Sequence, residues 1–179
     1  MKKMIAPMIC ALAVAAPVAL VGPSSAVAAP KTPVASIDAS WVQASIQGEL
    51  AQVQAGKLAL QKSSLPSVVA LGNAMIYQHT KLLAESTRCA TRLGITIPTT
   101  PSATQQGMLT TLEGLSGRAF ATAFASDEAS GHLTFITLTE QEIATSTNAA
   151  AKAAARFYLP FELNREGLAK AAMKVLGTS

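Results

Sequence analysis

The stretch "LGNAMIYQHTKLLAES", residues 71–86, decides the fold class and raises the question of function. Leu71, Met75 and Leu82 recur at the three- and four-residue spacing of a buried helix face, and His79 falls in the same stripe. A buried imidazole needs a partner, because an unpaired polar group in a core costs free energy. The stretch therefore predicts a helix whose buried face carries a polar site.

The composition of the whole chain favours helices. Hydrophobic residues make up 50% of the chain and charged residues only 13%. Alanine dominates, and no alternating strand-like run extends beyond a few residues. The sequence therefore predicts an all-α protein.

Prolines, glycines and capping residues divide the chain into helices. We expect long helices over 38–62, with Asp38 as N-cap, 66–93, 116–144 and 148–177, because Pro66 suits a first turn and Gly94 a left-handed C-cap. Pro160 should kink the last one. These lengths favour an antiparallel four-helix bundle. A short extra helix over 105–114, between the second and third long helices, should pack over one end of the bundle. The apolar anchors expected on the third long helix are Phe120, Phe124, Phe135 and Leu138.

The N-terminus reads as a secretory signal peptide over residues 1–28. Lys2 and Lys3 precede the apolar run "MIAPMICALAVAAPVALVG", and "SSAVAAP" offers small residues for cleavage. A linker over 29–36 then leads into one domain over 37–177. We therefore expect an exported protein of the periplasm, cell envelope or extracellular space, with no stable membrane insertion once the signal is removed.

Charge and cysteine content exclude two classes. The net charge is +4, of which Lys2 and Lys3 supply two, and the remaining basic residues are scattered. Aromatic residues make up only 4% of the chain, so we expect no nucleic-acid binding. After signal removal only Cys89 remains, so no intramolecular disulfide is expected.

Four phrases together resemble a known family. They are "GKLALQKSSLPSVVALGNAMIYQHTKLLAESTRCATRLGITIP", "LEGLSGRAF", "GHLTFITL" and "YLPFELNREGLAKAA". In order and spacing they resemble the bacterial exported family called domain of unknown function 4142, over about residues 37–174. The resemblance implies a ferritin-like four-helix bundle. It implies no activity, because the family has no established biochemical role.

The chain departs from the pattern that the resemblance implies. Gln78 stands where an acidic residue usually precedes the helix-two histidine, and Arg165 stands where a histidine is expected. Glutamine also replaces common glutamates at Gln52 and Gln54, and Ala121 replaces an aspartate. His79 and His132 persist.

The helix bounds place four polar residues at a similar height. Gln52, His79, His132 and Arg165 each lie roughly midway along their own predicted helix. In an antiparallel bundle such positions meet at one level. We therefore expect a central polar layer formed by these residues together with Gln78.

A di-iron site is not expected in this layer. Such sites need inward Glu-x-x-His pairs, but Ile76 and Ala129 stand three residues before the two histidines. A smaller site remains open, because Glu128 lies one turn before His132 on the same face. His79, His132 and Glu128 form a candidate metal site for one zinc or copper ion, with water or Asp127 as fourth ligand.

The alternative is a purely structural layer. In this interpretation Gln52, Gln78, Tyr77 or Glu128 pairs with each buried histidine, and Arg165 forms a local ion pair with Glu162 or Glu166. The function predicted first is a non-enzymatic exported bundle without a cofactor, which acts on an unidentified protein or envelope component. The alternative function is a bundle that binds a single divalent transition metal.

Overall fold

The computed structural model describes residues 34–178, and within that range it contains five α-helices and no strand. The helices are α1 (Ser36–Lys62), α2 (Pro66–Leu93), α3 (Ala103–Gly114), α4 (Gly117–Thr145) and α5 (Ala149–Leu176). The all-α prediction is confirmed, and each predicted helix is present with its ends shifted by two residues or fewer. The predicted signal peptide lies outside the described residues, as does most of the predicted linker.

The residues that flank the helices explain where the helices begin and end. Gly94 has a left-handed φ of 71° and ends α2, as glycine does readily. Ser102 and Gln105 form a capping box at the start of α3. The prediction for Asp38 was wrong, because Ala35 occupies the N-cap position of α1 and Asp38 lies buried in the first turn.

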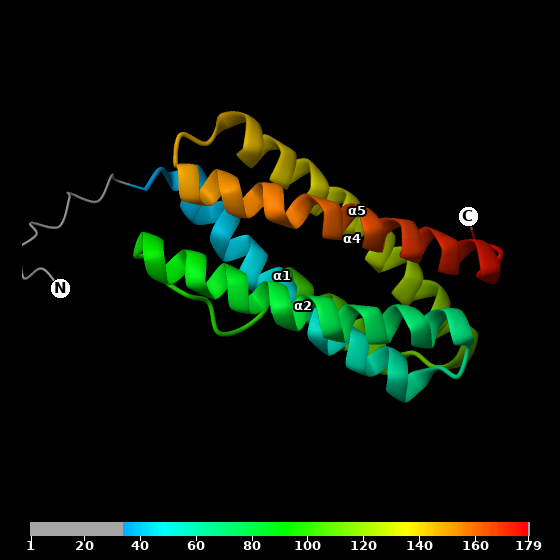
Figure 1. Cartoon of the computed structure of the whole chain (residues 1–179). Coiled ribbons are helices and arrows are strands. Elements are labelled where there is room, and N and C mark those ends of the chain that lie inside the picture. The colour runs from blue at the N-terminus through cyan, green and yellow to red at the C-terminus, as the bar shows by residue number, and fades with distance from the viewer. Residues whose placement is uncertain (1–33, 179) are drawn as a thin grey trace, which may run out of the picture. The chain divides into compact units, whose positions relative to one another are not determined.

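The long helices form two hairpins that pack against each other (Figure 1). α1 packs mainly against α2, and α4 packs mainly against α5. Gly56 and Gly72 allow the first hairpin to close tightly, because a Cβ on Gly72 would lie 2.9 Å from the Ala59 Cβ. Between the hairpins α2 faces α5, and α1 faces α4 with fewer contacts.

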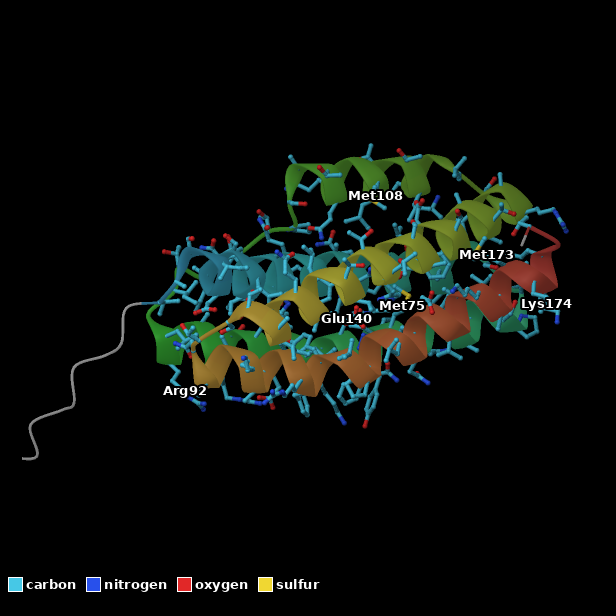
Figure 2. All side chains as sticks on the ribbon, turned by 90° about the horizontal axis from the view of Figure 1, so that it is seen from above. Met75, Arg92, Met108, Glu140, Met173 and Lys174 are labelled. Carbon is cyan, nitrogen blue, oxygen red and sulfur yellow. The ribbon has the colours of Figure 1, made fainter. Side chains whose placement is uncertain are left out.

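The connection from α2 to α4 crosses back along the bundle. In Figure 1 α2 and α4 run in the same direction, so residues 94–116 return the chain to the opposite end. α3 forms part of this return and lies along α1 and α4, as Figure 2 shows near Met108. The expectation that this helix packs over a bundle end was wrong. It covers the flank formed by α1 and α4, where the two hairpins contact each other less than they do between α2 and α5.

The apolar core consists of two clusters, one toward each end of the bundle. Phe120 and Phe124 are fully buried as predicted, but Phe135 is only partly buried and Leu138 is 43% exposed. On all four long helices the central polar positions fall between the residues of the two clusters. A layer of polar groups therefore separates two apolar halves.

None of the helices between residues 34 and 178 is apolar over enough of its length to cross a membrane.

Candidate functional site

Each hairpin buries one histidine–glutamate pair in the central layer. In the first hairpin His79 Nδ1 lies 2.5 Å from Glu49 Oε2, and in the second His132 Nδ1 lies 2.7 Å from Glu162 Oε2. All four residues are 2% exposed. Because both partners of each pair come from one hairpin, each imidazole is oriented within its own half of the molecule.

Packing of the hairpins brings the two imidazoles together. Their ring centroids are 5.6 Å apart and their planes differ by 15°. Glu128, one turn before His132 on α4, places Oε2 3.4 Å from His132 Nε2. That separation suits an ion pair but is long for a hydrogen bond. The predicted trio of His79, His132 and Glu128 does lie in one place.

Arg165 adds a buried positive charge to the same layer. Its side chain is fully buried, Nη1 donates to Glu162 Oε1 at 3.0 Å, and Nε donates to Gln78 Oε1 at 3.1 Å. The predicted ion pair with Glu162 is confirmed. Glu166 pairs with Lys170 instead. Glu162 therefore contacts two positively charged or protonatable groups at once.

Burial and neighbouring charges shift the pKa values of the two imidazoles in opposite directions. Burial lowers the pKa of His79 well below its usual range, and the charges of Arg165 and His132 lower it further. Burial alone would also lower the pKa of His132, but Glu128 and Glu162 outweigh it and raise that pKa to about 9. At neutral pH His79 is therefore uncharged and His132 is an imidazolium.

Two carboxyl groups of the layer hold protons more strongly than usual. Burial raises the pKa of Glu49 well above its ordinary value, and the charge of Glu162 adds to this effect while Arg165 opposes it. Burial also raises the pKa of Glu128, although the nearby His132 opposes the shift.

The central layer forms one side of a pocket of about 420 Å³ between α1, α3 and α4. Gln52, His79, Glu128 and His132 line its polar side. The other walls are largely apolar and include Ala51, Ala55, Leu109, Leu112, Phe135 and Leu138. α3 supplies the outer wall. A concave apolar pocket with a few convergent polar groups is typical of small-molecule sites.

Several buried polar atoms at this pocket have no hydrogen-bond partner within the described part of the chain. They are Nε2 of His79, Nε2 of His132, Oε2 of Glu128 and Oε1 of Gln52. Buried polar groups in folded proteins are nearly always paired, so four such atoms around one pocket call for an explanation.

The residues meet one requirement of a metal site and miss another. Metal-bound histidines commonly give their second ring nitrogen to a carboxylate, and both imidazoles have that arrangement here. However, no group of three or more His, Cys, Asp and Glu side chains among residues 34–178 is placed to hold a metal ion. Side chains would have to move to complete a coordination sphere.

The sequence identified most of this site but assigned some partners incorrectly. The structure brings His79, His132, Glu128, Arg165 and Gln78 together and places Gln52 on the same pocket. Tyr77 is not a partner, because it is 62% exposed. The sequence did not predict that Glu49 is the partner of His79, or that His132 Nδ1 forms a hydrogen bond with Glu162.

A second pair of buried carboxyl groups lies nearer the start of α1. Asp38 and Glu142 are each 1% exposed. Burial raises the pKa of Glu142 to about 7, with the adjacent Asp38 carboxyl as the next cause. This pair is separate from the pocket, which neither residue lines.

One family model matches most of the chain. The model described as "Domain of unknown function (DUF4142)" matches residues 23–163. The chain belongs to this family. The resemblance noted in the sequence is thereby confirmed. The match includes Glu49, His79, His132 and Glu162, whereas Arg165 lies two residues beyond its end.

No curated protein matches the chain, and no solved structure matches it. Membership of the family therefore brings no assigned activity with it, and the function has to be argued from the site.

Proposed function

We propose that this protein is an exported, non-enzymatic binding protein with a ferritin-like fold, and that it holds a small ligand in the pocket between α1, α3 and α4. The export part rests on the apolar N-terminal run and its small-residue cleavage pattern. The ferritin-like part is supported by the single long crossover between two helical hairpins. The proposal includes no catalytic step.

One observation carries the binding proposal. Four buried polar atoms on Gln52, His79, Glu128 and His132 form no hydrogen bond within residues 34–178 and border a single pocket of about 420 Å³, although Glu128 Oε2 and His132 Nε2 lie 3.4 Å apart as an ion pair. A layer that served only to fix helix packing would be expected to pair its own polar atoms. A ligand with matching polar groups would satisfy them, and its remaining surface would contact the apolar walls.

A larger side chain in the pocket should weaken the binding of a small ligand without disrupting the fold. A Cβ at Gly48 or Gly131 would meet its nearest neighbour only at 3.8 or 3.9 Å, and both residues line the pocket. Leucine at either position can therefore extend into the pocket. We expect at least one of 2-phenylethylamine, 2-phenylethanol and phenylacetate to bind the mature protein, and Gly131→Leu to weaken that binding at least about tenfold.

Isothermal titration calorimetry of each probe provides the measurement. Gly167→Leu is the matched control, because Gly167 is also inside a helix but has open space around it and lies away from the pocket. Gly48→Leu repeats the test from the opposite helix. Binding of none of the three probes, or equal binding by Gly131→Leu and Gly167→Leu, would contradict the proposal.

A second candidate function is the binding of one zinc or copper ion. The observation that favours it is the pair of imidazoles, each of which contacts a glutamate carboxyl group through Nδ1 and forms no hydrogen bond at Nε2 among the described residues. His79, His132 and Glu128 would hold the ion, with Asp127 or water completing the set. A bound ion would require His132 to give up the proton that it carries at neutral pH.

Metal binding predicts stoichiometric uptake that releases protons. We expect about one zinc or copper equivalent by elemental analysis of protein dialysed against the metal and then buffer. The thermal midpoint of unfolding should rise. At a metal concentration a hundredfold above Kd, binding should raise the free energy of unfolding by about 2.7 kcal/mol. His79→Ala should lose the effect, and Thr80→Ala, an exposed neighbour, should keep it. An unshifted wild-type midpoint with both metals would rule this function out.

A further inference from the structure

Carboxyl groups outnumber basic groups on the lining of the pocket. Glu49, Asp127, Glu128 and Glu162 contribute carboxyl groups, and none of the described lining residues is a lysine or arginine. The two imidazoles are the other titratable groups on its surface. An anionic ligand would therefore bring its charge close to several carboxyl groups, whereas a cation would be attracted.

The basic groups of the central layer already pair with Glu162 and Glu128, whereas Asp127 has no such partner. Arg165 and His132 both bond to Glu162, and His132 also lies beside Glu128. Asp127 forms no ion pair with any described cation. A cationic group placed at Asp127 would therefore meet a carboxyl group that no described cation neutralises.

The pocket also has two buried acceptor atoms that receive no hydrogen bond from the described residues. Oε2 of Glu128 and Oε1 of Gln52 have no hydrogen-bond partner in residues 34–178, although both atoms are buried. Asp127 adds a carboxylate on the same lining. A primary ammonium group has three N–H donors and no acceptor, which suits a lining that offers several acceptors. Hydrogen bonds to charged groups are also stronger than neutral ones.

The rest of the lining fits an apolar body. The apolar walls include Leu109 and Leu112 from α3, Ala51 and Ala55 from α1, and Phe135 from α4. A polyamine would leave further ammonium groups against these walls, where their desolvation would go uncompensated. A compound with one ammonium group and an aromatic or branched aliphatic body satisfies both parts of the pocket.

We infer that the ligand of this pocket is a small primary ammonium compound with an apolar body, whose charged group is received by Asp127, Glu128 and Gln52. The inference rests on the proposed function and names the ligand class. In this inference the Asp127 carboxylate makes the pocket bind a cation more tightly than a neutral or anionic compound. Helix α3 contacts the apolar body of the ligand.

The test compares three probes of similar skeleton but different charge on the mature full-length protein. 2-Phenylethylamine is the cation, 2-phenylethanol the neutral isostere and phenylacetate the anion. At about pH 7.5 we expect the amine to bind at least about tenfold more tightly than the alcohol, because a hydrogen bond to a charged group adds about 1.5 kcal/mol or more. Phenylacetate should bind least tightly.

Asp127→Asn should remove the preference while retaining the pocket. Asparagine has nearly the same shape, so we expect the amine-to-alcohol ratio to fall to about threefold or less with alcohol binding unchanged. Glu140→Gln is the matched control, because it removes the same charge from an exposed position of α4 that lies off the pocket. It should keep the wild-type ratio. Glu128→Gln provides a second variant should Asp127→Asn fail to fold.

Two results would overturn the inference without touching the binding proposal. The first is that 2-phenylethanol or phenylacetate binds as tightly as 2-phenylethylamine, while Gly131→Leu still weakens its binding. The second is an amine preference that survives both Asp127→Asn and Glu128→Gln. Loss of all probe binding would instead contradict the proposed function itself.

Discussion

Replacing Glu162 by alanine is expected to destabilise the protein by about 3–5 kcal/mol, the range for removing one partner of a buried ion pair. Glu162 accepts from Arg165 Nη1 and bonds to His132 Nδ1, and all three side chains are almost fully buried. Its removal would leave two buried cations without this carboxylate. Because a typical domain is stable by only about 5–15 kcal/mol, chemical denaturation with urea should show a large shift of the midpoint.

Glu166→Ala is the matched control for this change. Glu166 lies one turn further along α5 and pairs with Lys170, whose side chain is 62% exposed, so its loss should cost about 1 kcal/mol or less. Combining Glu162→Gln with Arg165→Met should recover part of the lost stability, because the uncompensated charge is then removed. Equal midpoints for Glu162→Ala and Glu166→Ala would contradict the arrangement described for α5.

Stability should fall as the pH rises from 7 to 9. The folded-state pKa of His132 is about 9, above the ordinary value of about 6.5, so the folded protein keeps a proton that the unfolded chain releases. The stabilisation is complete below about pH 6.5 and is lost as the pH rises through about 9. The slope should approach about 1.4 kcal/mol per pH unit, for a total of about 3 kcal/mol.

The groups around His132 decide whether this slope can be attributed to it. His132 faces Glu128 on its own helix, Glu162 and Arg165 on α5, and His79 on α2. The lowered pKa of His79 acts at more acidic pH, where protonation favours the unfolded chain. The raised pKa of Glu142, about 7 against the ordinary 4.5, makes stability fall mainly between these two pH values and changes it little above them.

Urea denaturation at several pH values, on wild type and His132→Gln, gives the measurement. The variant should be less stable at pH 7 and nearly independent of pH from 7 to 9, because glutamine does not titrate. A variant that keeps the wild-type slope would show that another group, such as Glu49, controls the alkaline loss of stability.

The fold could be predicted because its signals are local. Pro66, Gly94 and Asn148 stand at helix ends for reasons of backbone geometry that neighbouring residues alone determine. The apolar stripe that carries His79 could also be read directly from the spacing. The placement of α3 could not, because its two buried leucines, Leu109 and Leu112, fit a bundle end and a bundle flank equally well.

The polar site was predicted in position but not in pairing. Glu49 lies seven residues after Val42 and three after Ile46, on the buried face of α1, and this spacing could have identified it. The sequence pattern points instead to Gln52 and Gln54 as the positions where glutamates are common, and a buried glutamate is rare. The walls of the pocket could not be predicted from the sequence, since they come from three helices whose separation depends on packing rather than on any one segment.

The division of the two histidine–glutamate pairs between the hairpins has a consequence for how the protein folds. Glu49 with His79, and His132 with Glu162, are each 30 residues apart in the chain, so each pair can form as soon as its own hairpin closes. The contact between the imidazoles and the pocket wall appears only when the hairpins dock. A ligand bound there would slow unfolding by holding the two hairpins together. The pocket could bind a ligand only after the hairpins had docked, which is the last step of folding.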